Sequence, residues 1–383
     1  MAGRSIGKGT VLIIILGIVS LFADFVYEGA RSIIPQYLTT LGGSVFLLGV
    51  VLGVSEFAGY AFRLVSGKIA DRTRGYWAIM FLGYAINLFA VPLLALSGNY
   101  ITAAILVFLE RFGKGTRAPS KDYVISTAAS KGGVGRAFAI SAGLDQVGAI
   151  VGPISVALIL LYKGTYRTAF AYLAIPGAIA MIVLLAAYMY HSKSRIRRQV
   201  PPKTDLMSSR RFLLYSIAIA VSAAGLYQVA FVLYGAQGQI DIALIPVIFL
   251  VAMIGEGLFG FVFGLLYDRI GRNLVYSGLL LSLFVPLLLL GGSPVYMFLA
   301  ALVFGAVTGI QDTVMRAVVG TTVHPKQRGY AYGIFNAFYG FGLLVSSVAI
   351  GYLYHSIANI VAYVFIIQAV AFVMLTVSFR KSV

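Results

Sequence analysis

Long apolar segments recur along the whole chain, and they restrict its fold more than any other feature of the sequence. A helix needs about 20 apolar residues to cross a bilayer, and we count twelve stretches of that kind. Such a helix also satisfies its own backbone hydrogen bonds in lipid. Only 11% of the residues are charged and 60% are hydrophobic, which is unusual for a soluble domain. The sequence therefore predicts an all-α membrane protein with twelve transmembrane helices, at about 10–38, 44–66, 76–97, 100–122, 137–161, 167–190, 212–236, 242–266, 274–291, 294–318, 329–354 and 357–379.

The twelve segments divide into two sets of six. Residues 191–211 separate the sets, and this stretch is rich in Lys and Arg and lacks apolar periodicity, which is typical of a solvated linker. A glycine-led charged turn at 67–75 stands between two apolar segments, and a second copy stands at 264–272, half a chain later. We therefore expect two pseudo-symmetric six-helix bundles, 1–190 and 212–383, joined by a cytoplasmic basic linker at 191–211.

The basic residues predict the orientation in the membrane. The chain has 29 Lys and Arg, and 20 of them lie in the termini, the linker and the loops on one side of the predicted bundles. The loops on the opposite side contain only Lys163 and Arg167. Because basic loops stay inside the cell, we expect a multi-pass protein of the plasma membrane with both termini in the cytoplasm. The same distribution argues against binding to nucleic acid.

Several classes of function lack their sequence signals. The chain has no cysteine, and its three histidines do not have metal-ligand spacing. Neither a nucleophile–base arrangement nor a phosphate-binding loop is present. We therefore expect no metal, no cofactor and no enzymatic activity, and we expect a monomer in the lipid bilayer.

Four short motifs carry a resemblance to a known family. Both copies of the turn read Gly-x-x-x-Asp-Arg, and three further stretches stand out: Asp24–Glu28, Arg111–Pro119 and Gly148–Pro153. The turns resemble the cytoplasmic loop signature of the major facilitator superfamily, roughly Gly-x-x-x-Asp-Arg-x-Gly-Arg, although the first copy ends Arg74-Gly75. The first two stretches resemble a bacterial and archaeal subgroup with a DxxxE first helix and an RxGKGxRxP fourth helix. The third resembles the fifth-helix motif of the superfamily's antiporters. The resemblance implies a secondary transporter that works by alternating access between the two bundles.

Three charged residues of the first segment share one helix face. Asp24, Glu28 and Arg31 are spaced i, i+4 and i+7. A charge at the bilayer centre costs about 2.5–3.5 kcal/mol on insertion scales, so each one needs a partner, water or a function. We expect the two carboxylates to bind and release protons, with Arg31 biasing their ionisation. The alternative is a structural ion pair that holds the first helix to a neighbour.

Other charged and amide side chains lie inside the predicted segments. In the fourth segment Glu110, Lys114, Arg117 and Lys121 follow a helical spacing, and they could attract an anionic substrate or balance the acids of the first helix. We expect Lys121 to reach the cytoplasmic headgroups instead. The candidates for a central cavity are Glu56, Arg63, Arg111, Lys114, Arg117, Gln228, Glu256 and Asn336.

The second half of the chain is poorer in buried charge. Asp312 and Arg316 are spaced i, i+4, and we expect them to form a satisfied pair. Glu256 has no local partner, so its role is open between structure and function. This asymmetry places the proton-coupling site in the first half.

The repeated turn is a candidate cytoplasmic gate. Asp145 shares a helix face with Ser141, Gly148 and Gly152, and helices approach closely along such small residues. We expect Asp145 to meet a basic partner there, and the resemblance implies Arg72. The alternative is that the turns only hold positive charge inside. The gate candidates are Gly67, Asp71, Arg72, Arg74, Asp145, Gly264, Asp268, Arg269 and Arg272.

These features together predict a transporter of a small organic or amphiphilic solute, working by proton-coupled export. Two alternatives stay open. The basic residues of the fourth segment could serve uptake or exchange of an anion or organic acid that is not driven by protons. The chain could also be a non-transporting membrane sensor or scaffold with the same fold.

Overall fold

The protein is described from a computed structural model, which covers residues 7–129, 133–192, 210–323 and 328–380. Within these ranges the chain is helical almost throughout and contains no β-strand. The helices of the first half are α1 (Lys8–Arg31), α2 (Ile34–Thr40), α3 (Val45–Thr73), α4 (Tyr76–Leu93), η1 (Leu94–Leu96), α5 (Tyr100–Ala128), α6 (Val134–Leu161), α7 (Tyr166–Tyr172) and α8 (Ala174–Ser192). Those of the second half are α9 (Arg210–Ala224), α10 (Val229–Ala236), η2 (Ile242–Leu244), α11 (Ile245–Ile270), η3 (Gly271–Leu274), α12 (Val275–Leu289), α13 (Pro294–Ile310), η4 (Gln311–Met315), α14 (Arg316–Thr322), α15 (Arg328–Leu353) and α16 (Ile357–Phe379).

The described helices group into the twelve predicted spans. Ten continuous helical stretches are long and apolar enough to cross a membrane, and one of them, Ile242–Leu289, contains two predicted spans that meet at η3. The remaining span is α5, which carries six charged residues and therefore lacks the apolar character of its neighbours. The predicted all-α fold is confirmed.

Several spans are interrupted inside the protein. The first span breaks between α1 and α2, and the seventh breaks between α9 and α10. The tenth widens into a π-helical turn, η4, between α13 and α14. Breaks of this kind at membrane depth are tolerated where the backbone lines a cavity or is buried in protein. They place the ends of helices, with their polar side chains, in the middle of the molecule.

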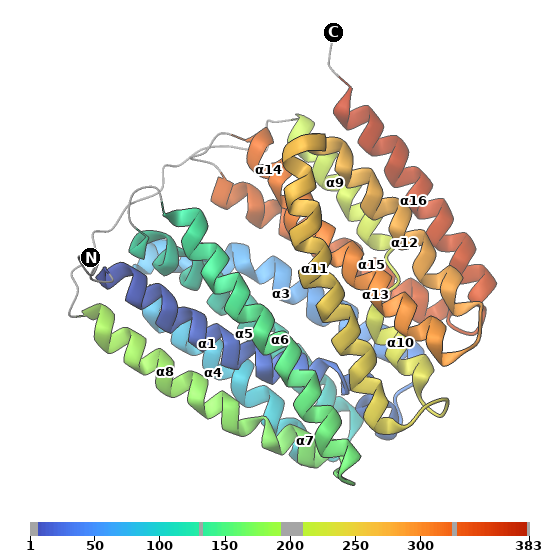
Figure 1. Ribbon diagram of the computed structural model, residues 1–383, viewed down its shortest axis with the longest axis horizontal. Coiled ribbons are helices and arrows are strands. Elements are labelled where there is room, and N and C mark those ends of the chain that lie inside the picture. The colour runs from blue at the N-terminus through green and yellow to red at the C-terminus, as the bar shows by residue number, and fades with distance from the viewer. Residues whose placement is uncertain (1–6, 130–132, 193–209, 324–327, 381–383) are drawn as a thin grey trace, which may run out of the picture.

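The buried apolar residues form two clusters, which correspond to two bundles. One cluster comes almost entirely from α1–α8, which we call the first bundle, and the other from α9–α16, the second bundle. In Figure 1 the blue-to-green helices lie beside the yellow-to-red ones, with α3 next to α15 and α6 next to α11. The predicted linker at 191–211 falls mostly on residues 193–209, outside the described residues, so the domain boundaries stay predictions.

The two charged turns are largely helical, which differs from the sequence-based expectation. Residues 67–73 form the last turns of α3, and the helix ends only at Arg74, whose φ of 55° is left-handed. In the second copy α11 continues to Ile270 and ends at Gly271, with a φ of 71°. Left-handed residues terminate helices, so the chain turns at the end of each motif.

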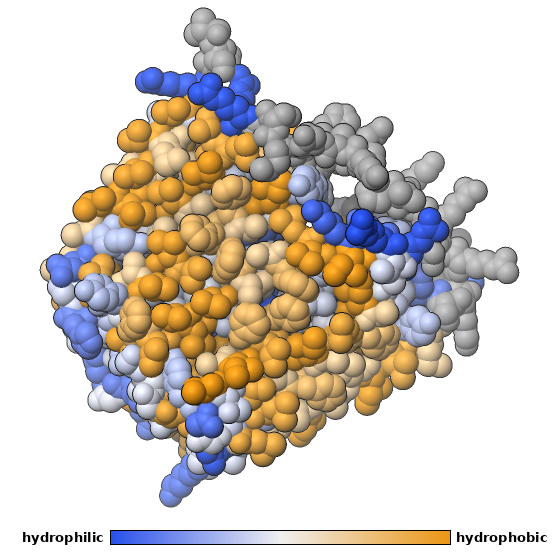
Figure 2. All heavy atoms as spheres, turned by 180° about the vertical axis from the view of Figure 1, so that it is seen from behind, coloured by the Kyte–Doolittle hydropathy of each residue, from blue (hydrophilic) through white to orange (hydrophobic). Residues whose placement is uncertain are grey.

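The outer surface is suited to lipid. In Figure 2 a broad hydrophobic band crosses the molecule, and hydrophilic residues gather at its two ends. We call the end at which α1 begins and α3 and α11 end the basic side, and the opposite end the far side. Large apolar side chains such as Phe89, Ile101 and Phe261 are exposed on this surface. An exposed apolar belt of this extent indicates a multi-pass membrane protein.

Glycines allow α1 and α6 to pack closely. A Cβ atom added at Gly148 would overlap the carbonyl oxygen of Leu21, and one at Gly152 would lie 2.5 Å from that of Phe25. Both approaches are far closer than atoms tolerate, so only glycine fits. The predicted close approach along this small-residue face is confirmed.

Candidate functional site

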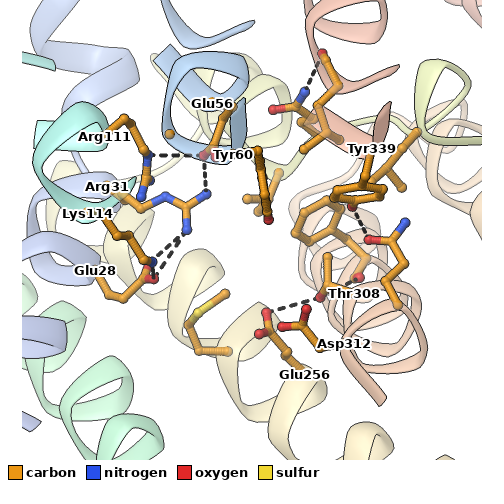
Figure 3. Close-up of a pocket in the computed structure, with 18 of the residues that line it drawn as sticks. Glu28, Arg31, Glu56, Tyr60, Arg111, Lys114, Glu256, Thr308, Asp312 and Tyr339 are labelled. Atoms are coloured by element: carbon orange, nitrogen blue, oxygen red, sulfur yellow. Dashed lines mark hydrogen bonds and ion pairs between the residues drawn. The ribbon is translucent and has the colours of Figure 1, made fainter. Parts of the chain in front are cut away.

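A cavity lies between the two bundles, near the middle of the molecule (Figure 3). In and around it about 880 Å³ is free of protein atoms, open solvent at its mouth included. Both bundles contribute polar side chains to it, although most of the protein interior is apolar. The lining residues are Glu28, Arg31, Glu56, Gly59, Tyr60, Arg63, Arg111 and Lys114 from the first bundle, and Leu226, Gln228, Val229, Phe249, Met253, Glu256, Phe304, Thr308, Gln311, Asp312, Tyr339 and Leu343 from the second.

Arg31 is the centre of an ion-pair network on the first-bundle wall. Its guanidinium NH1 lies 3.0 Å from Oε2 of Glu28, and NH2 lies 3.1 Å from Oε1 of Glu56. Lys114 Nζ lies 3.8 Å from the other oxygen of Glu28. Arg31 stands at the end of α1, where the first span breaks, so it can reach across to α3.

Arg111 extends this network into α5. Its Nε lies 3.1 Å from Oε1 of Glu56 and 3.4 Å from Oε2 of Glu110. Asn87 of α4 donates to Oε1 of Glu110 at 2.9 Å and to the Glu110 carbonyl oxygen at 3.0 Å. Three acids therefore alternate with three bases in one network, of which all but Glu110 line the cavity. Such pairing offsets much of the cost of keeping charges out of water.

The two acids predicted to carry protons lie in different surroundings. Glu28 lines the cavity, whereas Asp24 is buried beside it and does not belong to the lining. The charged groups that act electrostatically on Asp24 are Asp145, Lys114, Arg117 and Lys121. The structure therefore separates the predicted pair into one cavity acid and one interior acid.

The aromatic rings of Tyr27 and Tyr84 face basic residues of α5. Lys114 Nζ lies 3.8 Å from the centre of the Tyr27 ring, and Arg117 lies 4.3 Å from the centre of the Tyr84 ring. Cations are stabilised over aromatic faces. Arg117 therefore lies inside the bundle and is not among the lining residues, unlike Lys114.

The second-bundle wall carries two carboxylates. Glu256 of α11 accepts a hydrogen bond from Thr308 Oγ1 at 3.1 Å. Asp312, in η4, pairs with Arg316 at 2.9 Å, which confirms the predicted i, i+4 pair. In Figure 3 the Glu256 and Asp312 side chains point toward each other below the cavity.

Amide and aromatic side chains complete the second-bundle wall. Gln228 stands at the break before α10 and donates to Ser347 Oγ at 2.5 Å and to the Leu343 carbonyl oxygen at 3.2 Å. Tyr339 donates to Gln311. The sequence reasoning missed Gln311 and Thr308, although Thr308 and Asp312 stand one turn apart. Asn336, which it included, does not line the cavity.

A second, smaller pocket adjoins the cavity on the far side. It is mainly apolar, with Ile34, Leu52 and Val107 among its lining residues, and it shares Arg31, Glu56 and Arg111 with the cavity. Beyond it, Gln36 of α2 donates to the carbonyl oxygen of Leu233 in α10 at 2.6 Å, and both side chains are fully buried. The two pockets thus lie side by side, and a contact between the bundles stands at the second one.

The gate candidates make contacts within their own bundles. Asp71 accepts from the Tyr76 hydroxyl at 2.7 Å, and Arg272 donates to the Phe379 carbonyl oxygen at 3.0 Å. Arg72 and Asp268 are exposed, as are the neighbouring candidates Arg74 and Arg269. In the part of the chain that the structure describes, no ion pair links the two copies of the motif. A gating role for them stays a prediction.

Asp145 has a basic partner, but the partner is Lys121 and not Arg72. Lys121 Nζ lies 3.4 Å from Oδ2 of Asp145 and donates to Ser20 Oγ at 2.7 Å. Lys121 is only 9% exposed. The prediction that it reaches the headgroups is wrong, because α1 and α6 cover it and supply the oxygens that an ammonium group needs.

The sequence profile described as Major Facilitator Superfamily matches residues 16–239 and 213–381, which together cover most of the chain. The chain belongs to the major facilitator superfamily. This superfamily consists of membrane transporters, so the protein is a membrane transporter. The relation agrees with the two bundles and with the cavity between them.

Relatives of this major facilitator protein occur in bacteria and archaea. An uncharacterised protein of Mycobacterium tuberculosis is 37% identical over 336 residues, covering 85% of this chain and 82% of the relative. An uncharacterised MFS-type transporter of Methanocaldococcus jannaschii is 28% identical over 284 residues, covering 72% and 70%. Among solved structures, the nucleoside transporter NupG superposes with a TM-score of 0.74 at 15% identity, covering 97% of this chain and 100% of that one. This structural similarity shows that the two proteins share a fold.

Proposed function

We propose that this superfamily member is a secondary transporter that exports a small organic solute across the plasma membrane in exchange for protons. The observation that carries the proposal is the charged cavity between the two bundles. Buried charges in a membrane protein are costly and mark sites of function. A site at the junction of two six-helix repeats, beside broken helices, is where a solute is bound in alternating access.

Glu28 is the proton acceptor in this proposal. It lies on the cavity wall and holds two cations, Arg31 and Lys114. A proton on Glu28 removes the negative charge that Arg31 and Lys114 share. Arg31 and Lys114 then lose part of their compensation, so the network has to rearrange.

Arg31 connects this change to the second bundle. Its guanidinium carbon lies 5.7 Å from the centre of the Phe249 ring in α11. Phe249 lines both pockets. A shift of Arg31 therefore acts at the junction of the bundles, which is where alternating access requires movement.

The test uses proteoliposomes and a solute identified by a thermal-shift panel on the purified protein. We expect Glu28→Gln to abolish uptake driven by a pH gradient, because the site can no longer release a proton. Exchange of labelled for unlabelled solute should persist, since it needs no net proton movement. Asp24→Asn, made separately, measures the contribution of the interior acid, and Asp241→Asn, an exposed acid that caps η2, is the matched control. Normal gradient-driven transport in the Asp24→Asn, Glu28→Gln double variant would refute proton coupling at this site.

An anion exchanger is the second candidate, and Arg63 supports it. Arg63 lines the cavity, its guanidinium lies 4.9 Å from the centre of the Tyr60 ring, and its Nε has no hydrogen-bond partner in the described residues. Such a group can receive an anion. Transport that survives collapse of the proton gradient but requires a counter-anion would favour this candidate. Ligand binding without any flux would instead favour a sensor or scaffold.

A further inference from the structure

The cavity carboxylates of the first bundle have basic partners, whereas one carboxylate of the second bundle has none among the described residues. Glu28 and Glu56 each hold two basic groups. Among the described residues Glu256 has one hydrogen-bond partner, the neutral Thr308 hydroxyl, and no ion pair. A carboxylate that faces a cavity without a basic partner attracts a positive charge from a ligand. The cavity is therefore complementary to a cation on the second-bundle side.

Close helix packing holds the backbone around Glu256 in place. A Cβ atom added at Gly305 of α13 would overlap the Ala252 carbonyl oxygen, and one at Gly309 would lie 2.6 Å from that of Glu256. These approaches show that α11 and α13 touch through their backbones. Glu256 is held at the cavity wall with Thr308 beneath it.

The groups around Glu256 suit an organic cation. Asp312 adds a second carboxylate nearby, and its own partner, Arg316, is not a lining residue. Phe249, Met253 and Tyr339 offer apolar and aromatic surface on the same wall. Ca²⁺ takes about 6–8 oxygen ligands, and among the described residues no group of three or more His, Cys, Asp or Glu side chains could hold a metal ion. An organic cation can therefore pair its charged nitrogen with a carboxylate and pack its apolar part against these side chains.

We infer that Glu256 binds the cationic nitrogen of the transported solute, so the substrates are small organic cations such as amines and quaternary ammonium ions. The inference rests on the proposed function and names its substrate class. Glu28, Arg31 and Glu256 line the same cavity, so a change of charge on one wall changes the potential at the other. A proton on Glu28 makes the first-bundle wall more positive, which opposes a cation at Glu256. Proton and substrate thus exclude each other, as exchange requires.

The binding test compares three probes with the same aromatic ring. Phenyltrimethylammonium is positive at every pH, benzyl alcohol is neutral and benzenesulfonate is negative. Each is titrated calorimetrically into the purified full-length protein. We expect the cation to bind at least tenfold more tightly than the other two, and Glu256→Gln to lose at least tenfold of that affinity. The Gln side chain keeps an oxygen that accepts from Thr308, and Glu256→Asp, which keeps the charge, should keep the preference for the cation.

Asp241→Asn removes the same charge outside the cavity and should leave the affinity unchanged. The inference is overturned if phenyltrimethylammonium does not bind, if a neutral or negative probe binds as tightly, or if Glu256→Gln binds the cation normally. Flux in proteoliposomes separates this inference from the proposed function. Proton exchange with a neutral or anionic solute alone would overturn the inference and leave the proposed function standing. Cation binding through Glu256 without flux of any solute would overturn the proposed function and leave the binding of a cation by Glu256 standing.

Discussion

Lys121 is a long basic side chain held inside a helix bundle. It stands on α5, and its ammonium group contacts oxygen atoms from two other helices. They belong to Ser20 on α1 and Asp145 on α6. Ser20 is completely buried, so it relies on protein partners for its hydrogen bonds. The lysine therefore joins three helices at one point, and its replacement should lower the stability of the protein.

We expect Lys121→Met to destabilise the protein by about 1–3 kcal/mol, the usual cost of leaving buried polar groups without partners. Adding Asp145→Asn should recover part of the loss, because the uncompensated carboxylate is then gone. Thermal unfolding in detergent measures both variants, and Lys163→Met, at an exposed lysine, is the control. Equal stability of wild type and Lys121→Met would show that the contacts of the ammonium group contribute nothing.

Residue contacts could be predicted from the sequence only where both partners stand on one helix. Asp312 and Arg316 are one turn apart, and their pair was expected and is present. Lys121 and Ser20 are separated by 101 residues. The spacing of residues along one helix cannot predict such a contact, because the contact depends on how separate helices pack.

At the scale of the helices, the seam between α1 and α6 depends on the absence of side chains. Gly148 faces the Leu21 carbonyl oxygen so closely that a methyl group has no space. Gly143 stands on the same helix, and a Cβ atom added there would have no neighbour within 4 Å. The two glycines differ only in what faces them.

We expect Gly148→Ala to cost about 1–3 kcal/mol, as overpacking does elsewhere, and to reduce transport because Asp24 lies next to the same seam. Gly143→Ala should be neutral or slightly stabilising, since alanine favours a helix over glycine by about 1 kcal/mol. Unfolding temperatures and transport rates of the two variants are compared side by side. If both variants behave alike, the close packing of α1 on α6 does not hold in the membrane.

The number and position of the spans followed from apolar length, which is a local property of the sequence. The breaks inside the spans did not, because Ser32 and Gly225 lie in stretches that read as continuous apolar helix. The π-helical turn at 311–315 leaves no pattern either. These irregularities position Arg31, Gln228 and Asp312, so the sequence pointed to several residues of the cavity but not to its shape.

At the scale of the whole molecule, α2 and α10 join the two bundles beside the second pocket. Gln36 and Leu233 have no exposed surface, and the hydrogen bond between them joins the two bundles. The alternating access that we propose requires this contact to open in the other state of the transporter. The half-chain repeat predicted that two bundles move against each other, but it could not show where they touch.

The absence of cysteine from the chain makes this opening measurable. We expect Leu233→Cys to react slowly with a hydrophilic maleimide added on the far side, and to react faster when the solute or a pH gradient drives turnover. The hydrogen bond survives the substitution, since Gln36 donates to the backbone oxygen at 233. Tyr162→Cys, at a residue 82% exposed near the far-side end of α6, should react at one rate in all conditions. A rate at position 233 that stays constant during turnover would mean that the bundles open elsewhere, because a buried thiol can be labelled only while its cover is displaced.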